Sequence, residues 1–283
     1  MKLNVTACAK INLTLDIVGV RNDGYHLLNM IMQSVSLADK ITVETVPNGE
    51  IIVTSSIASL GGTDDIAYKA ANLFFMTAKI SSGVNIHIDK HIPCAAGLGG
   101  GSADAAAVLL ALNKIFDYPL TDERLEEISL TLGADVPYFL HGGTVSVTGI
   151  GENFRKLNDM PNCYIVIAKN AIKPSTAEMY RQIDDNDFPH PKVECAELAI
   201  EKGDYKLLCE SLDNMFAHLW NCEDLVNIME CCGADSISLS GSGPSYFALF
   251  SDKDKAEQCL NTFAKNDIKA YLCNPTKKAI IIE

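Results

Sequence analysis

A glycine-rich segment that runs directly into an alanine-rich segment constrains this chain most. Residues 93–109 read Pro-Cys-Ala-Ala-Gly-Leu-Gly-Gly-Gly-Ser-Ala-Asp-Ala-Ala-Ala-Val-Leu, so four of the five positions from 97 to 101 are glycine. Such a loop leaves backbone N–H groups open and leads into the N-terminus of a buried helix, where the helix dipole also favours negative charge. A tight turn before a helix is the alternative, but it needs only one or two glycines. The segment therefore predicts a phosphate-binding loop.

The loop differs from the two best-known phosphate-binding patterns. It contains no lysine and does not match G-x-x-x-x-G-K-[ST]. Counted from Gly97, it also fails G-x-G-x-x-G, because Ser102 stands where the last glycine would be. The strands before it read as an antiparallel or mixed sheet rather than a doubly wound one. The remaining interpretation is a cradle of backbone amides and a helix dipole, with positive charge supplied from elsewhere in the chain.

Composition and charge exclude several classes of protein. The chain has 283 residues, 48% of them hydrophobic, which is enough for two domains with cores of their own. Its net charge of −13 disfavours a nucleic-acid or anionic-membrane partner. No apolar run reaches the roughly 18 residues of a membrane span, and the first residues lack the apolar region of a signal peptide, so we expect a cytoplasmic protein. The ten cysteines are scattered without a CxxC and read as reduced thiols, with a disulfide framework or a zinc site as the alternative.

Hydrophobic periodicity predicts an α+β fold. We expect two domains, residues 1–155 and 156–283, and a mobile, solvated loop at 184–191. In the first domain we expect a strand pair within residues 3–20, with Lys10 between its two parts. Further strands are expected at 41–46, 51–53, 84–89 and 142–152, and helices at 66–79, from about 102 to 112, and from Thr121 to a stop at Gly133. In the second domain we expect strands at 164–168, 236–240 and 246–250 and a helix at 252–265.

The glycine-rich segment resembles the ATP-binding motif of the GHMP kinase superfamily. Five further segments match that superfamily in order, at residues 9–13 (Ala-Lys-Ile-Asn-Leu), 24–26 (Gly-Tyr-His), 133–137 (Gly-Ala-Asp-Val-Pro), 175–180 and 239–245. The GLGGGS form is most similar to members whose acceptor is a cytidine diphosphate sugar-alcohol in isoprenoid precursor synthesis. The resemblance implies a two-domain kinase with ATP in the N-terminal domain, the acceptor in the cleft between domains, and ATP and Mg²⁺ as cofactors.

The resemblance also assigns catalytic and ATP-binding residues. It makes Asp135 the base that accepts the proton of the acceptor hydroxyl; from the residues alone, Asp135 is equally well the N-cap of a helix that contains Pro137. It places Lys10 beside that aspartate, where its charge stabilises the transferring group, whereas an ordinary strand lysine would be solvated. Ser102 is the residue expected nearest to the metal. The residues expected to hold ATP are Pro93, Ala96, Gly97, Leu98, Gly99, Gly100, Gly101 and Ser102.

The acceptor site is expected around residues 24–26. By default, Tyr25 and His26 are an aromatic and a histidine on a surface loop. The resemblance implies that Tyr25 and Tyr180 enclose a cytosine, while His26 hydrogen-bonds its edge. Asn12, on the same strand face as Lys10, is expected to help hold acceptor or phosphate oxygens.

Two positions depart from the family pattern, and two other functions stay open. Asp65 stands where the family usually has an asparagine lining the nucleotide, and residues 213–217 match their motif weakly. The glycine turn at 240–245 is either a simple hairpin or a backbone that approaches the phosphate loop. One alternative function is a kinase of the same superfamily that acts on homoserine, mevalonate or a sugar. The other is a non-catalytic nucleotide-binding module. We expect a monomer or a homodimer.

Overall fold

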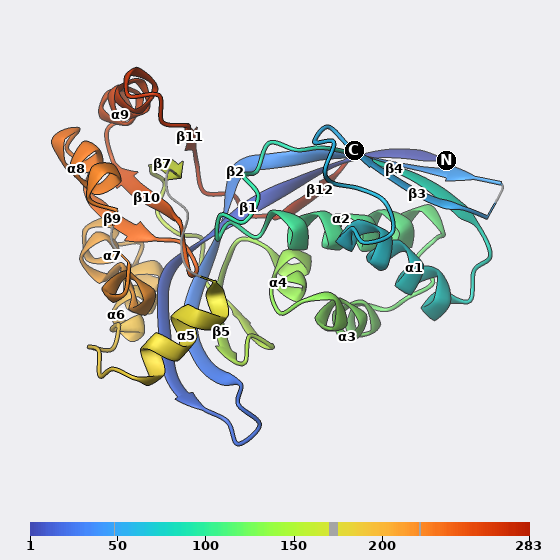
Figure 1. Cartoon of the computed structure of the whole chain (residues 1–283), viewed down its shortest axis with the longest axis horizontal. Helices are drawn as coiled ribbons and strands as arrows, with labels where there is room; N and C mark the ends of the chain where they lie inside the picture. Colours follow the sequence, from blue (N-terminus) through green and yellow to red (C-terminus); the bar gives the residue numbers. More distant parts are fainter. Residues whose placement is uncertain (48, 170–174, 221) are drawn as a thin grey trace.

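The computed structural model describes residues 1–47, 49–169, 175–220 and 222–283. These residues form two sheets flanked by helices (Figure 1), so the predicted α+β class is confirmed. The strands are β1 (Lys2–Val20), β2 (His26–Val46), β3 (Ile51–Ser55), β4 (Gly83–Asp89), β5 (Thr144–Gly149), β6 (Asn153–Lys156), β7 (Tyr164–Lys169), β8 (Asp213–Asn214), β9 (Ser236–Leu239), β10 (Ser245–Phe250), β11 (Ala270–Cys273) and β12 (Ile280–Ile282). The helices are α1 (Ile66–Ala78), α2 (Gly100–Ile115), α3 (Asp122–Leu132), α4 (Val136–His141), α5 (Thr176–Asp184), α6 (Val193–Lys202), α7 (Tyr205–Ser211), α8 (Glu223–Cys231) and α9 (Lys253–Lys265), with the 3₁₀-helix η1 (Met215–His218).

Two long antiparallel strands, β1 and β2, form the backbone of the larger sheet. The predicted strand pair within residues 3–20 is wrong, because β1 is one strand of 19 residues. Its register against β2 shifts between Cys8 and Ala9, between Asn12 and Thr14, and between Ile17 and Gly19. Residues 7–17 are all buried, Lys10 among them, so a lysine that reads as a break between two strands lies inside a single strand. The strand from residue 26 to 40 was also missed.

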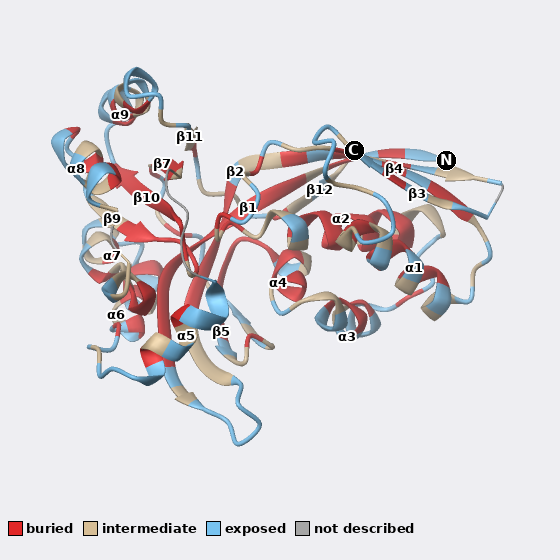
Figure 2. Cartoon of the chain, in the orientation of Figure 1, coloured by how far each residue is buried: buried red, intermediate tan, exposed pale blue. Residues whose placement is uncertain are grey.

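The larger sheet has the order β12-β1-β2-β4-β3, with β5, β6 and β8 attached. It is mixed, as predicted, since β3 pairs with β4 and β8 with β1 in parallel. Helices α1 to α4 cover one face of it (Figure 1). Helix α2 is buried on nearly every side, also as predicted (Figure 2). It begins at Gly100, two residues before the expected start, so the last two glycines of the loop form its first turn.

The smaller sheet, in the order β11-β7-β10-β9, has helices on both faces. Along β10, Tyr246 and Ala248 join the core that contains α8 and α9, whereas Phe247 and Leu249 join the core that contains α6 and α7. The predicted strands and helix of this half are confirmed to within two residues. The last strand, β12, returns to the larger sheet beside β1, and the division at residue 155 stays a prediction.

Among the described residues, no helix combines the length and the apolar character that crossing a membrane requires.

Candidate active site

The glycine-rich loop lies between β4 and α2 and is clamped by two other segments. A Cβ atom on Gly97 would lie 2.2 Å from the carbonyl oxygen of Ser240, and the φ of Gly97 is +74°, so only glycine fits. The Ser240 hydroxyl donates to the Gly97 carbonyl at 2.9 Å. From the other side, the Lys10 amide of β1 donates to the Leu98 carbonyl at 3.0 Å. The turn between β9 and β10 therefore approaches the loop closely, which a simple hairpin would not require.

A cavity of about 490 Å³ opens beside the loop. This volume is in the range of small-molecule sites. Of the residues predicted to hold ATP, all line the cavity except Leu98, which is buried in a core cluster. The lining residues are Leu60, Asp64, Asp65, Ile66, Lys90, Pro93, Cys94, Ala95, Ala96, Gly97, Gly99, Gly100, Gly101, Ser102 and Asp104.

Lys10 and Asp135 meet at one end of the loop. Lys10 is 3% exposed, so the interpretation as a solvated strand lysine is wrong. Its Nζ lies 3.7 Å from Oδ2 of Asp135, whose side chain is 37% exposed. Asp135 holds the N-cap position of α4, but its side chain makes no capping hydrogen bond. Its carboxylate is therefore open to the solvent and to a ligand.

Asn12 joins Lys10 to the turn between β9 and β10. Its Oδ1 accepts hydrogen bonds from Lys10 Nζ at 2.7 Å and from the Gly241 amide at 2.9 Å. Asn214 braces the same turn by donating to the carbonyls of Leu239 and Gly241. The weakly matching segment 213–217 thus supplies a buried support, and binding of ligand oxygens by Asn12 stays a prediction.

The predicted acceptor residues lie partly together. His26 stacks on Tyr180 with ring centroids 4.3 Å apart, and its Nε2 lies 2.8 Å from Oδ1 of Asp184. Tyr25 is 60% exposed, in the turn between β1 and β2. Burial, and then the charge of Asp135, raise the pKa of Tyr180 to about 12. Tyr180 is therefore within electrostatic reach of Asp135, and its phenol keeps its proton at neutral pH.

The 184–191 loop is mostly exposed, as predicted, and is anchored at two points. Phe188 stacks on His218 with centroids 5.3 Å apart and rings almost parallel. His190 Nδ1 lies 2.8 Å from Oδ1 of the buried Asp16. Both contacts tie the loop to segments near the acceptor residues, and its mobility stays a prediction.

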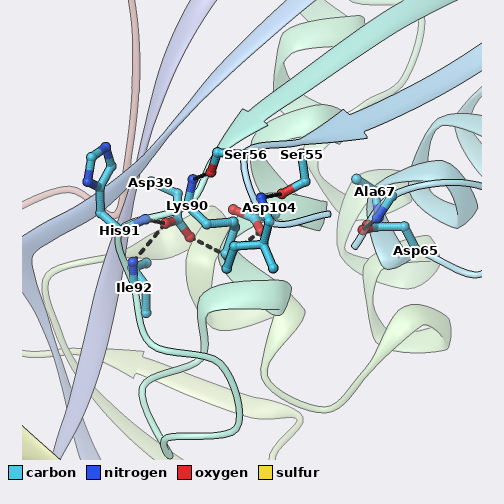
Figure 3. Close-up of polar contacts among 11 residues, drawn as sticks. Asp39, Ser55, Ser56, Asp65, Ala67, Lys90, His91, Ile92 and Asp104 are labelled. Atoms are coloured by element: carbon cyan, nitrogen blue, oxygen red, sulfur yellow. Dashed lines mark hydrogen bonds and ion pairs between the residues drawn. The ribbon is translucent and has the colours of Figure 1, made fainter. Parts of the chain in front are cut away.

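The structure also contains a buried charge cluster that the sequence does not predict; it consists of Asp39, Lys90 and Asp104, and we call it the Lys90 cluster. Lys90 lies between the two carboxylates, as Figure 3 shows. Asp104 was the available signal, because it is the one charged residue in the otherwise apolar segment 103–112. Asp65 lies nearby and caps α1, accepting from the Ala67 amide at 2.8 Å.

Comparison with known proteins identifies the family. Residues 65–143 match the GHMP kinases N terminal domain, and residues 196–269 match the GHMP kinases C terminal domain. The chain belongs to the GHMP kinase family, a class of small-molecule kinases.

Its relatives agree closely in length. It is 38% identical to a 4-diphosphocytidyl-2-C-methyl-D-erythritol kinase of Clostridium botulinum, over 95% of this chain and 99% of the relative. It is 40% identical to the enzyme of that name from Exiguobacterium sibiricum, over 92% of this chain and 93% of the relative. A crystal structure of 4-(cytidine 5'-diphospho)-2C-methyl-D-erythritol kinase is similar with a TM-score of 0.80 and 31% identity, covering 97% of this chain and 99% of the other. A homoserine kinase from Cytophaga hutchinsonii, at 18% identity and a TM-score of 0.78, shares the fold; it covers 100% of this chain and 97% of the other.

Proposed function

We propose that this chain transfers the γ-phosphoryl group of ATP to the C2 hydroxyl of 4-diphosphocytidyl-2-C-methyl-D-erythritol, a step of non-mevalonate isoprenoid precursor biosynthesis. The observation that supports the transfer reaction is the position of Lys10 and Asp135 at the glycine-rich loop. Lys10 is buried, and the neighbouring Asp135 is partly exposed and makes no capping hydrogen bond with its side chain. The choice of acceptor is supported by relatives named 4-diphosphocytidyl-2-C-methyl-D-erythritol kinase, which match almost the whole chain.

The residues at the loop divide the work of phosphoryl transfer. Backbone amides of residues 97–101 and the N-terminus of α2 bind phosphate oxygens. The Asp135 carboxylate orients the acceptor hydroxyl and accepts its proton. Lys10, fixed by Asn12 at 2.7 Å, places its charge where negative charge develops on the transferring group. The positive charge that the loop lacks thus comes from β1.

Mg²⁺ would neutralise charge on the phosphates when bound. The described residues contain no group of three or more histidine, cysteine, aspartate or glutamate side chains that could hold a metal ion. At this end of α2 the cavity is lined by Ser102, the residue predicted nearest to the metal, and by Asp104, whose Oδ2 accepts from Lys90. That set suits Mg²⁺, which keeps several waters and binds largely through substrate phosphates.

The contacts of His26 suggest how the site distinguishes a cytidine diphosphate acceptor. Its ring is held by Tyr180 and Asp184, so that ring and tyrosine offer stacking surface and a hydrogen-bonding edge to a base. We expect His26→Ala to raise the KM of this acceptor about tenfold, the order of one lost hydrogen bond, with a smaller effect on kcat. Steady-state kinetics with the acceptor varied measures both constants, and an unchanged KM would remove His26 from the acceptor site.

An ADP-release assay with ATP and Mg²⁺ tests the function. The panel contains 4-diphosphocytidyl-2-C-methyl-D-erythritol, homoserine, mevalonate and galactose. We expect turnover with the first compound alone. Activity on another compound and none on the first would favour a different GHMP kinase, and ATP binding without turnover on any would favour a non-catalytic module. A monomeric or homodimeric state, a cytoplasmic location and the two-domain division at residue 155 stay predictions.

A further inference from the structure

The Lys90 cluster lies beside the glycine-rich loop, and the proposed reaction gives it no task. Its three side chains come from β2, from the segment after β4 and from α2, and they are 0%, 5% and 5% exposed for Asp39, Lys90 and Asp104. Lys90 Nζ donates to Oδ2 of Asp39 at 2.5 Å and to Oδ2 of Asp104 at 2.7 Å (Figure 3). One ammonium group thereby joins three segments that meet at the loop.

On one side, the cluster fixes the chain that enters the loop. The second oxygen of Asp39 accepts hydrogen bonds from the amides of His91 and Ile92 at 2.6 and 2.8 Å. The Lys90 amide donates to the hydroxyl of Ser56 at 2.9 Å. The backbone is therefore held up to the residue before Pro93.

On the other side, the cluster reaches the first turns of α2. Asp104 lies one turn after Gly100, on the same face of the helix. A Cβ atom on Gly100 would lie 3.4 Å from Lys90 Nζ and 3.0 Å from a methyl group of Ile92. The ammonium group thus lies directly against glycine backbone that lines the cavity.

Stability does not account for this arrangement. Burying charged groups is costly, and well-packed apolar residues in their place are often as stable or more stable. The second oxygen of Asp104 is buried without a hydrogen-bond partner among the described residues, which adds to the cost. A buried charge cluster of this kind is better explained by its holding neighbouring segments in position than by a gain in stability.

We propose that Asp104, acting through Lys90, is a positioning residue that holds the first turn of α2, and with it the amides of Gly100 and Gly101, against the phosphates of ATP. This inference rests on the proposed function. Displacement of a binding group by about 1 Å can cost on the order of a hundredfold in rate, so a fixed helix start has a direct effect on ATP.

Three variants test the proposal. Asp104→Ala removes the carboxylate within an alanine-rich helix, where alanine is the best helix former. Asp104→Asn keeps an oxygen that accepts from Lys90. Asn113→Ala is the matched control, because Asn113 is a buried polar residue at the other end of α2 whose side chain bonds to the backbone of Leu120. Calorimetric titration with ATP alone gives its Kd, steady-state assays give both KM values and kcat, and urea unfolding checks that each variant is folded.

We expect Asp104→Ala to raise the Kd and KM of ATP about tenfold, while the KM of the acceptor changes less than about twofold. Asp104→Asn should stay within about threefold of wild type, and Asn113→Ala within about twofold. Wild-type affinity in Asp104→Ala, or equal loss in Asn113→Ala, would overturn the positioning role. A wild-type chain that binds no ATP would overturn the proposed function and this inference together, whereas normal transfer in Asp104→Ala with unchanged ATP affinity overturns this inference alone.

Discussion

Two lysines flank the glycine-rich loop, and their surroundings are opposite. Lys90 lies against Gly100 and donates to two buried carboxylates at 2.5 and 2.7 Å. Lys10 lies against Gly99 and donates to the amide oxygen of Asn12, while its nearest carboxylate, on Asp135, is 3.7 Å away and 37% exposed. Both lysine side chains are almost fully buried, at 4% and 5% exposure.

The difference shows that burial does not decide what a lysine does. A lysine saturated by close carboxylates has its charge neutralised and serves to join segments. A lysine that is held by a neutral amide, with its counter-charge beyond hydrogen-bond distance, keeps its charge for an incoming phosphoryl group. The four predictions below test this contrast, from the largest expected effect to the smallest.

The Asp135 carboxylate should matter for turnover and hardly at all for stability. We expect Asp135→Asn to lower kcat about a thousandfold, within the range of lost general-base catalysis. The urea midpoint and the Kd of ATP should match wild type, because the side chain caps no helix. Retained turnover would remove Asp135 from the base role.

Lys90 should matter first for stability. Lys90→Met removes the counter-charge of the buried Asp39 and the hydrogen-bond donor of the buried Asp104, and we expect the free energy of unfolding to fall by about 3 kcal/mol or more. Lys10→Met should lower the free energy of unfolding less than Lys90→Met does, because Asp135 is partly solvated. It should lower kcat more. Lys40→Met, at an exposed lysine next to Asp39 that donates to Thr6, is the control and should change stability by less than about 0.5 kcal/mol. Equal losses of unfolding free energy and of kcat in Lys10→Met and Lys90→Met would show that the two lysines do not differ in role.

Asn12 should affect kcat by fixing the orientation of the Lys10 side chain. Asn12→Leu removes the acceptor of Lys10 Nζ and of the Gly241 amide, and the cost of unpaired buried donors is about 1 to 3 kcal/mol. We expect kcat to fall about tenfold to thirtyfold. Asn214→Leu disturbs the same turn without touching Lys10, so it should lower the urea midpoint with a smaller effect on kcat. Equal kcat losses in both would assign the effect to the turn.

How far the sequence predicts this molecule depends on the range of the contacts. Helix α3 was predicted from Thr121 to Gly133 because its caps are local, and the structure has both residues at its ends. The loop was predicted because its glycines are adjacent. The continuity of β1 was missed because Lys10, which reads as a solvated break between two strands, is buried inside one strand. The Lys90 cluster was missed because the partners of Lys90 lie 51 residues before it and 14 residues after it, and no local pattern encodes that meeting.

The smallest effect concerns the pH dependence of stability at Asp104. Burial, and then the charge of Asp39, raise the pKa of this carboxyl above its ordinary value. The folded chain then holds a proton over a pH range in which the unfolded chain, with an aspartate pKa of about 3.9, has lost it. Since the folded state binds more protons there, the free energy of unfolding falls as pH rises through that range. Asp104→Asn has no such proton and should not show this part of the fall.

We therefore expect the stability of Asp104→Asn relative to wild type to increase between pH 5 and pH 8, by about 1.4 kcal/mol for each pH unit over which wild type holds the proton in the folded state alone. Urea unfolding of both proteins across that range measures the difference. Parallel curves for Asp104→Asn and wild type would mean that Asp104 is ionised in the folded chain, and that Lys90 balances two charges rather than one.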